Sequence, residues 1–212
     1  MTTAFSLRHA LWLCLLLSWT LPAANNAVTG RIGTLGIGVE YAVGISDDMQ
    51  WRFGINGGSH EFSTNDGGVD YNLKYKLRSA DVLFDWHPFQ GIFYTSIGVL
   101  YNRNQLDASA KSSSSVQVGN TTYPAGTNLT GKATFNTFSP YLGVGWGRPP
   151  SARGLIWMVD VGVVYQGAPK VKLQSNSGVS QSDLDREAVD LQNAINRYKY
   201  YPHVGGSFGF RF

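Results

Sequence analysis

The sequence predicts an all-β protein, an eight-stranded antiparallel β-barrel that crosses the outer membrane of a bacterium. Three observations support this prediction. The chain ends in Phe208-Gly209-Phe210-Arg211-Phe212, which places aromatic rings on one face of a strand and small or charged residues on the other. The same period of two recurs along the chain. The N-terminus has the form of an export signal.

The first residues predict a secretory signal peptide. A short basic start precedes an apolar run at 10–21, which is too short for a spanning helix, and small residues follow at Ala23 and Ala24. We therefore expect export to remove residues 1–24 and residues 25–212 to form the barrel. The only cysteine lies inside the apolar run, so the exported chain has no thiol for a disulfide or for thiolate chemistry.

The composition fits a membrane barrel better than a soluble enzyme. The chain has 25 glycines and 13% aromatic residues but only 15% charged residues. After residue 24 no apolar stretch approaches the roughly 18 residues that a spanning helix requires, so only strands could cross a membrane. The formal net charge of +3 is too small to indicate a nucleic-acid partner.

Alternating segments separated by turn residues define seven strands directly. We expect them near 35–45, 51–56, 69–86, 93–101, 132–147, 155–165 and 200–212. Because bacterial single-chain barrels have an even number of strands, residues 26–32 are assigned as the eighth. Short turns near 47, 89 and 149 then face the periplasm, and outer loops fall near 33–34, 58–68, 103–131 and 167–199.

Two local features complete the predicted fold. The apolar face changes sides at Ser79-Ala80, and a β-bulge there would explain the change. The last outer loop is expected to hold a short helix, with Ser182 as its cap and Asp185 in the capping-box position. Its apolar stripe consists of Leu184, Ala188, Leu191, Ile195 and Tyr198. We expect the stripe to pack on neighbouring loops; the alternative is a lid or docking helix over the outer mouth.

Short motifs in a fixed order resemble the carbapenem-associated outer-membrane protein family, the CarO-type barrels described as ornithine or basic amino acid uptake porins. The motifs are Gly33-Thr34-x-Gly36, Gly57-Gly58, Pro140-Tyr141-Leu142-Gly143, Pro169-Lys170-Val171-x-Leu173, and Lys199-Tyr200 followed by Pro202-x-Val204-Gly205. The chain departs from that family at its end, which is Phe-Arg-Phe rather than Tyr-Trp. The resemblance implies a channel for small basic or zwitterionic amino acids.

The alternation predicts a charge network in the lumen. The inward residues are expected to be Glu40, Arg52, Arg78, Asp81, Asp85, Asp160 and Arg211. Unpaired, each would cost several kcal/mol of desolvation. Because an eight-stranded barrel is just wide enough for side chains to fill, geometry favours a salt-bridge plug in a non-conducting structural or adhesive barrel. The resemblance favours an uptake channel, in which the acids hold an ammonium group while Arg52 or Arg211 faces a carboxylate. We predict the channel and keep the plugged barrel as the alternative.

Other partners follow from the surface. The rings of Phe208, Phe210 and Phe212 resemble the terminal signal that the barrel assembly machinery recognises. Outer-membrane lipid and lipopolysaccharide are expected around the barrel. A basic strand end at 74–78 could bind lipopolysaccharide phosphates or could simply be solvated. Aromatic residues near the strand ends are expected to form interfacial girdles.

Enzymatic activity is not expected. After the signal segment the only histidines are His60, His87 and His203, and no nucleophile elbow, paired catalytic carboxylates or metal-spaced histidine pair accompanies them. We therefore predict no catalytic residue, no metal site and no cofactor.

Overall fold

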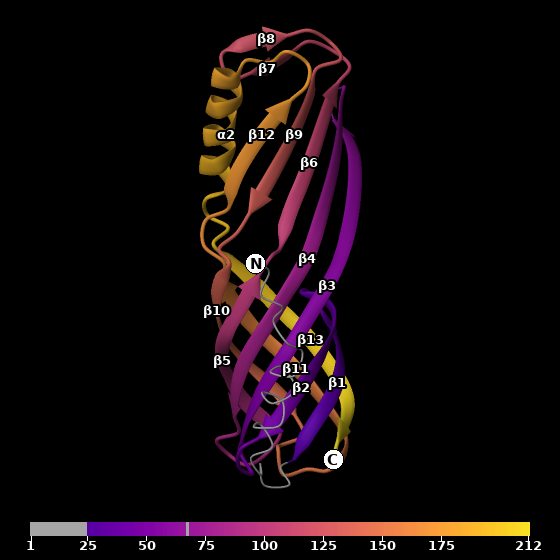
Figure 1. Cartoon of the computed structure of the whole chain (residues 1–212), viewed down its shortest axis with the longest axis vertical. Helices are drawn as coiled ribbons and strands as arrows, with labels where there is room; N and C mark the ends of the chain where they lie inside the picture. Colours follow the sequence, from indigo (N-terminus) through magenta and orange to yellow (C-terminus); the bar gives the residue numbers. More distant parts are fainter. Residues whose placement is uncertain (1–24, 67) are drawn as a thin grey trace, which may run out of the picture.

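The computed structural model describes residues 25–66 and 68–212, and the predicted signal peptide lies outside the described residues. Two levels are visible along the long axis, a closed ring of strands and a taller, open sheet that continues from one side of it (Figure 1). Both ends of the described chain, at Asn25 and Phe212, lie at the far end of the ring from the sheet, where the amide of Phe212 donates to the carbonyl of Asn26.

Eight strands close the ring. In chain order they are β1 (Asn26–Gly33), β2 (Gly36–Gly44), β3 (Met49–Asp66), β4 (Val69–Trp86), β5 (Phe93–Asn102), β10 (Phe138–Gly147), β11 (Gly154–Tyr165) and β13 (Tyr200–Arg211). Each is antiparallel to its neighbour, and β1 closes the ring on β13 from Ala27↔Arg211 to Gly33↔Gly205. The eight-stranded barrel is confirmed, and so is the eighth strand assigned at 26–32.

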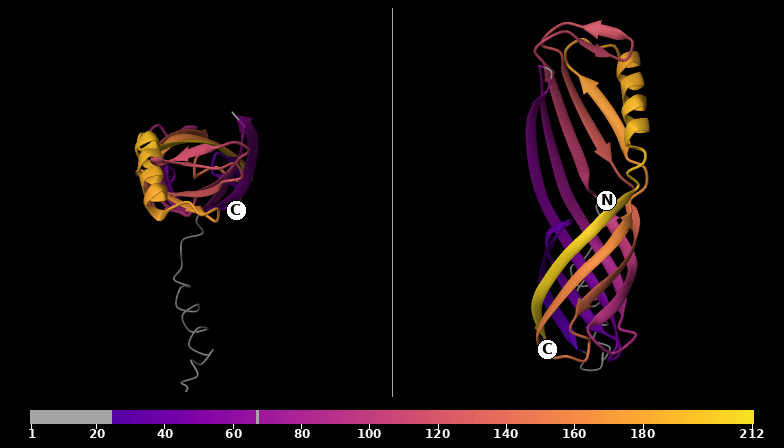
Figure 2. Two further views of the ribbon diagram at one scale, coloured as in Figure 1. Left: turned by 90° about the horizontal axis from the view of Figure 1, so that it is seen from above. Right: turned by 180° about the vertical axis from the view of Figure 1, so that it is seen from behind.

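The two long predicted outer loops are mostly regular structure. They contain β6 (Gln105–Ser112), β7 (Val116–Val118), β8 (Thr121–Tyr123), β9 (Asn128–Thr134), β12 (Lys170–Ser175) and α2 (Gln181–Ile195). β3 and β4 continue past the ring, and β6, β9 and β12 pair onto them in turn. Polar segments with weak strand signals thus find backbone partners on the long β3–β4 hairpin. The sheet and α2 stand above the ring, with the β7–β8 hairpin at the top (Figures 1 and 2).

The predicted strand at 132–147 is two strands. Residues before the break belong to β9, which pairs with β6 and β12 in the upper sheet, whereas β10 pairs with β5 and β11 in the ring. The chain leaves one level and enters the other at 135–137, where it is not a strand.

The β-bulge predicted at Ser79-Ala80 is absent. Pairing between β3 and β4 runs without interruption from Met49↔Trp86 to Asp66↔Val69. Odd-numbered side chains of β4 therefore point to the interior along the whole strand. The apolar residues change faces because the strand leaves the membrane, where its outer face must be apolar, and enters water, where its outer face is polar.

The N-cap of helix α2 lies two residues before the predicted one. Ser180 is the N-cap, and its side chain accepts from the backbone amide of Asp183. The predicted pair, Ser182 with Asp185, has the same spacing in the sequence, so the pattern alone could not separate the two starts. The helix packs against β12, and Leu184 is the most buried residue of its stripe. No helix in the described part of the chain is long and apolar enough to cross a membrane.

Candidate functional site

The exterior of the ring is apolar all around. Outward side chains such as Ile37, Ile97 and Leu142 are 60–69% exposed. Trp and Tyr residues stand at the two ends of this band: Trp51, Trp86, Trp146 and Trp157 near the short turns, and Tyr101, Tyr165 and Tyr200 toward the upper sheet. An apolar band with aromatic borders matches a barrel in a lipid bilayer. Because short turns face the periplasm in such barrels, the upper sheet is extracellular.

Arg52 is the centre of the lumen. Its guanidinium group is fully buried and contacts three carboxylates: Asp85 Oδ2 lies 2.6 Å from Nε, Asp160 Oδ1 lies 2.8 Å from Nη2, and Glu40 Oε2 lies 3.3 Å from Nη1. The ring of Tyr94 packs 5.5 Å from its Cζ, and the Tyr94 hydroxyl donates to Asp160 Oδ1 at 2.8 Å. One cation thus holds carboxylates that come from three different strands.

A second arginine, Arg31 on β1, extends the network. Its Nη1 lies 3.1 Å from Glu40 Oε2 and 3.0 Å from Asp81 Oδ1, so Glu40 bridges the two arginines. Arg31 is not among the residues predicted from the sequence, because strand parity alone assigns 26–32 as a strand and does not say which of its side chains point inward. Alternation of Thr29 and Arg31 with Val28 and Ile32 is the signal that could have found it.

Arg211 is also buried in the lumen, but it joins the network through an amide. It donates to Gln50 Oε1 at 2.7 Å, and Gln50 donates in turn to Asp85 Oδ2 at 2.8 Å. Arg211 also donates to the carbonyl of Asn25 at 2.7 Å. Gln50, which the sequence analysis did not single out, is therefore the link between the C-terminal strand and the charged centre.

Arg78 does not belong to the network, and its predicted inward position is wrong. It is exposed, and its neighbour Ser79 is the buried residue at that level of β4. The sequence pattern predicts that the apolar side chains at 69–77 face lipid, and Arg78, which alternates with them, then points into the lumen. Since the inward and outward sides of β4 do not change along the strand, those apolar residues face the inner side of the upper sheet. Arg78 faces outward.

Apolar layers lie on both sides of the charged centre. On the extracellular side of the charged centre a buried apolar cluster consists of Leu35, Leu83, Leu100, Tyr141 and Val164, with Tyr201 packed against it. Toward the periplasm Ala27, Ala42 and Ile156 form another. Ions between two apolar layers are shielded from water, which strengthens their mutual attraction and raises the free-energy cost of separating them.

The remaining predicted residues lie apart. Phe208, Phe210 and Phe212 are 53–61% exposed on the outside of the ring. His87 and His203 are buried and His60 is exposed, each on a different part of the fold. Among the described residues there is no group of three or more His, Asp or Glu side chains that could hold a metal ion.

No protein-family model matches the chain, and no curated protein sequence matches it. Two crystal structures from Acinetobacter baumannii are similar in fold. CarO2 shares 22% identity at a TM-score of 0.63, over 89% of this chain and 99% of its own. CarO shares 24% identity at a TM-score of 0.60, over 88% of this chain and 97% of its own. The chain therefore has the fold of CarO, as its motifs predicted.

Proposed function

We propose that this protein is a non-conducting outer-membrane barrel, whose lumen is a structural plug and whose working surface is the extracellular sheet with α2. The observation that carries the proposal is the complete burial of Arg52 among Glu40, Asp85 and Asp160. This is the alternative that the sequence left open beside an uptake channel.

The energetics of the network support a plug. Removing one partner from a buried ion pair costs about 3–5 kcal/mol, because the other charge is left uncompensated in a medium of low polarity. A solute that crossed the lumen would have to displace Arg52 from all three carboxylates and also part the apolar cluster around Leu83 and Tyr141. Thermal fluctuation alone would open such a path rarely.

One observation favours the second candidate, an uptake channel for a basic amino acid. The buried network has four carboxylates, from Glu40, Asp81, Asp85 and Asp160, against the guanidinium groups of Arg31, Arg52 and Arg211. An excess of acidic groups suits a cationic solute, whose ammonium or guanidinium group could replace an arginine. The uptake function and its solute remain predictions.

Single-channel recording in planar bilayers separates the two functions. The plug predicts a silent wild type, and the variants Arg52→Gln and Asp160→Asn should lose stability without gaining a conductance that selects cations. Arg78→Gln, which removes an exposed arginine, is the matched control and should behave as wild type. A steady wild-type conductance, together with swelling of proteoliposomes in lysine, would reject the plug in favour of the channel.

A further inference from the structure

Basic side chains gather on the outward face of the upper sheet. Pairing places Lys76, Gln105, Thr134 and Lys170 in one row across β4, β6, β9 and β12, and Lys74, Asp107, Lys132 and Lys172 in the next row. Arg78 lies one step below the first row, and the amide of Arg103 donates to its carbonyl. We call these seven the basic face: Lys74, Lys76, Arg78, Arg103, Lys132, Lys170 and Lys172.

The basic face begins where the lipid-facing band ends. Ala80 is paired with Tyr101, and Tyr101 with Phe138, at the upper border of the band. Arg78 is the next outward residue of β4, and the guanidinium group of Arg103 lies 5.1 Å from the Tyr101 ring. Each further row is two residues higher, about 7 Å along a strand. The charges, from Arg78 to Lys74, thus occupy the first ~20 Å along the strand above the aromatic border.

Few acidic residues offset these charges. Glu61 lies 3.3 Å from Lys74 and Asp107 lies 2.7 Å from Lys76. Hydrogen bonds from Asn72 and Lys74 lower the pKa of Glu61, and a hydrogen bond from Lys76 lowers the pKa of Asp107. Both side chains are therefore carboxylates that already have a lysine partner. In the part of the chain that the structure describes, Lys132, Lys170 and Lys172 form no ion pair.

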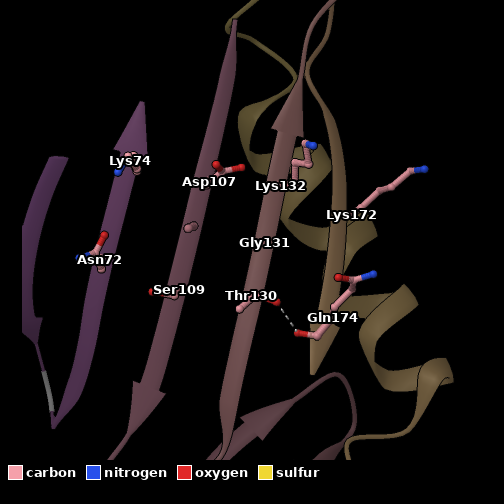
Figure 3. A pocket seen from close by; sticks show the side chains of 10 residues that line it. Asn72, Lys74, Asp107, Ser109, Thr130, Gly131, Lys132, Lys172 and Gln174 are labelled. Carbon is pink, nitrogen blue, oxygen red and sulfur yellow. Dashed lines mark hydrogen bonds between the residues drawn. The ribbon is translucent and has the colours of Figure 1, made fainter. Parts of the chain in front are cut away.

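The excess of basic residues on this face ends with the row of Lys74. The row above Lys74 is uncharged and consists of Asn72, Ser109, Thr130 and Gln174. These residues and the row of Lys132 line a shallow hollow of about 430 Å³ on the outward face (Figure 3). In the row above that of Asn72, Lys111 lies opposite Asp70, so that row has no net charge. The excess of positive charge is thus confined to the rows nearest the membrane.

We propose that the basic face binds the phosphate groups of lipopolysaccharide in the outer leaflet. Its position matches the headgroup layer, and lysines suit phosphates as strong point charges. The rings of Tyr101 and Phe138 directly below give the acyl chains of the same lipid an apolar surface. Such a contact would brace the extracellular sheet against the membrane. The proposal goes beyond the proposed function, because it holds whether or not the lumen conducts.

The test uses the full exported chain, refolded in a zwitterionic detergent and titrated with fluorescently labelled lipopolysaccharide. The variant Lys132→Gln/Lys170→Gln/Lys172→Gln removes three charges and leaves no carboxylate without its partner. Each lysine near an anionic surface contributes enough that we expect affinity to fall about tenfold to a hundredfold. The control Lys111→Gln/Arg186→Gln/Arg153→Gln removes three exposed charges outside the basic face and should bind as wild type. Of these, Lys111 lies on the same side of the sheet, two rows above Lys74. A Lys→Arg triple variant at the same three positions should retain binding.

Two further arms identify the ligand. Dephosphorylated lipopolysaccharide, with the same acyl chains, should bind the wild type at least as weakly as the triple variant binds the intact lipid, because the variant keeps four basic residues. Rising salt should weaken only the binding of the intact lipid. Equal loss in the triple variant and its control, or undiminished binding of the dephosphorylated lipid, would overturn the proposal. Complete displacement of the lipid by excess inorganic phosphate would also overturn it, because the site would then be one for free anions.

Discussion

The two ends of strand β4 have their apolar residues on opposite faces. In the ring its inward residues include Asp81 and Asp85, and its outward residues include Val82 and Trp86. In the upper sheet the inward side is apolar, and the outward side carries Lys74 and its neighbours. The pairing register does not change between the two levels. The period of a strand is therefore fixed by its backbone, whereas the surrounding medium selects which face is apolar.

The two levels also differ in what holds them together. Lipid gives the ring no hydrophobic reason to fill its interior, so a complete set of backbone hydrogen bonds and a paired charge network stabilise it. The upper sheet stands in water and gains from burying apolar surface against α2. Breaking the charge network should thus affect the ring far more than any exposed charge affects the sheet.

The largest expected effect is that of Arg52→Met. It leaves Asp85, Asp160 and Glu40 without their shared cation, so the free energy of unfolding should fall by about 3–5 kcal/mol. Urea unfolding in phosphatidylcholine vesicles, followed by tryptophan fluorescence, measures it. Arg78→Met in the same vesicles should change stability by no more than about 0.5 kcal/mol. Similar losses in both variants would show that burial does not distinguish the two arginines.

A lysine introduced on the outward face of β4 tests whether that face meets lipid in the ring and water in the upper sheet. Val82→Lys places a charge in lipid and should cost about 2–4 kcal/mol, depending on depth. Asn72→Lys adds the same charge to the same face ten residues away, in water, and should cost less than about 0.5 kcal/mol. The same vesicle assay applies. If Asn72→Lys proved as costly as Val82→Lys, the border between membrane and water would have to lie above the row of Asn72.

The sequence predicted the ring well because lipid imposes a strict rule on it. Every strand there must be apolar outside, so alternation identifies both the strand and its faces, as at residues 155–165 in β11. The rule fails above the membrane. There β6 and β9 have short, polar sequences that resemble loops, and their strand structure depends on the distant β3–β4 hairpin.

The errors in the predicted site have the same origin. The sequence contained the change of apolar face at Ser79-Ala80 but not the medium that caused it, so Arg78 was placed inside. Which charges pair is set by the closure of the ring, since Arg52 and Asp160 are 108 residues apart in the chain. The alternation of the sequence predicts that Arg52 and Asp160 both point inward, but their contact is known only from the closed ring.

The next effect tests the extracellular level alone. Ser180→Ala removes the side-chain acceptor for the amide of Asp183 and should cost about 1 kcal/mol, confined to α2. Hydrogen exchange of the first turn of the helix measures it. Ser182→Ala removes the hydroxyl that the sequence favoured as the cap and should leave exchange nearly unchanged. Faster exchange in Ser182→Ala than in Ser180→Ala would place the cap where the sequence analysis put it.

The smallest effect is a pH dependence of the contact between α2 and the β7–β8 hairpin. The carboxylate of Asp183 accepts from Ser180 Oγ and from the Tyr123 hydroxyl, each at 2.8 Å, and these bonds lower its pKa to about 2. Because the pKa is lower in the folded state than in the unfolded state, the stabilisation is complete at neutral pH. It is lost as the pH falls from about 4 to about 2.

Cleavage of the extracellular part by pepsin over that pH range measures this loss, since the protease is active there. The wild type should become more susceptible as the pH approaches 2, relative to Asp183→Asn, whose amide cannot titrate and whose susceptibility should follow only the pH dependence of the protease. Asp185→Asn, which removes an exposed carboxylate two residues further into the helix, should follow the wild type. Parallel profiles for the wild type and Asp183→Asn would mean that this carboxylate does not hold the hairpin to the helix. The β7–β8 hairpin would then be held to the helix by the remaining hydrogen bonds, which run from the amide of Gly119 to Glu187 Oε2 and from the amide of Ser180 to the Tyr123 hydroxyl.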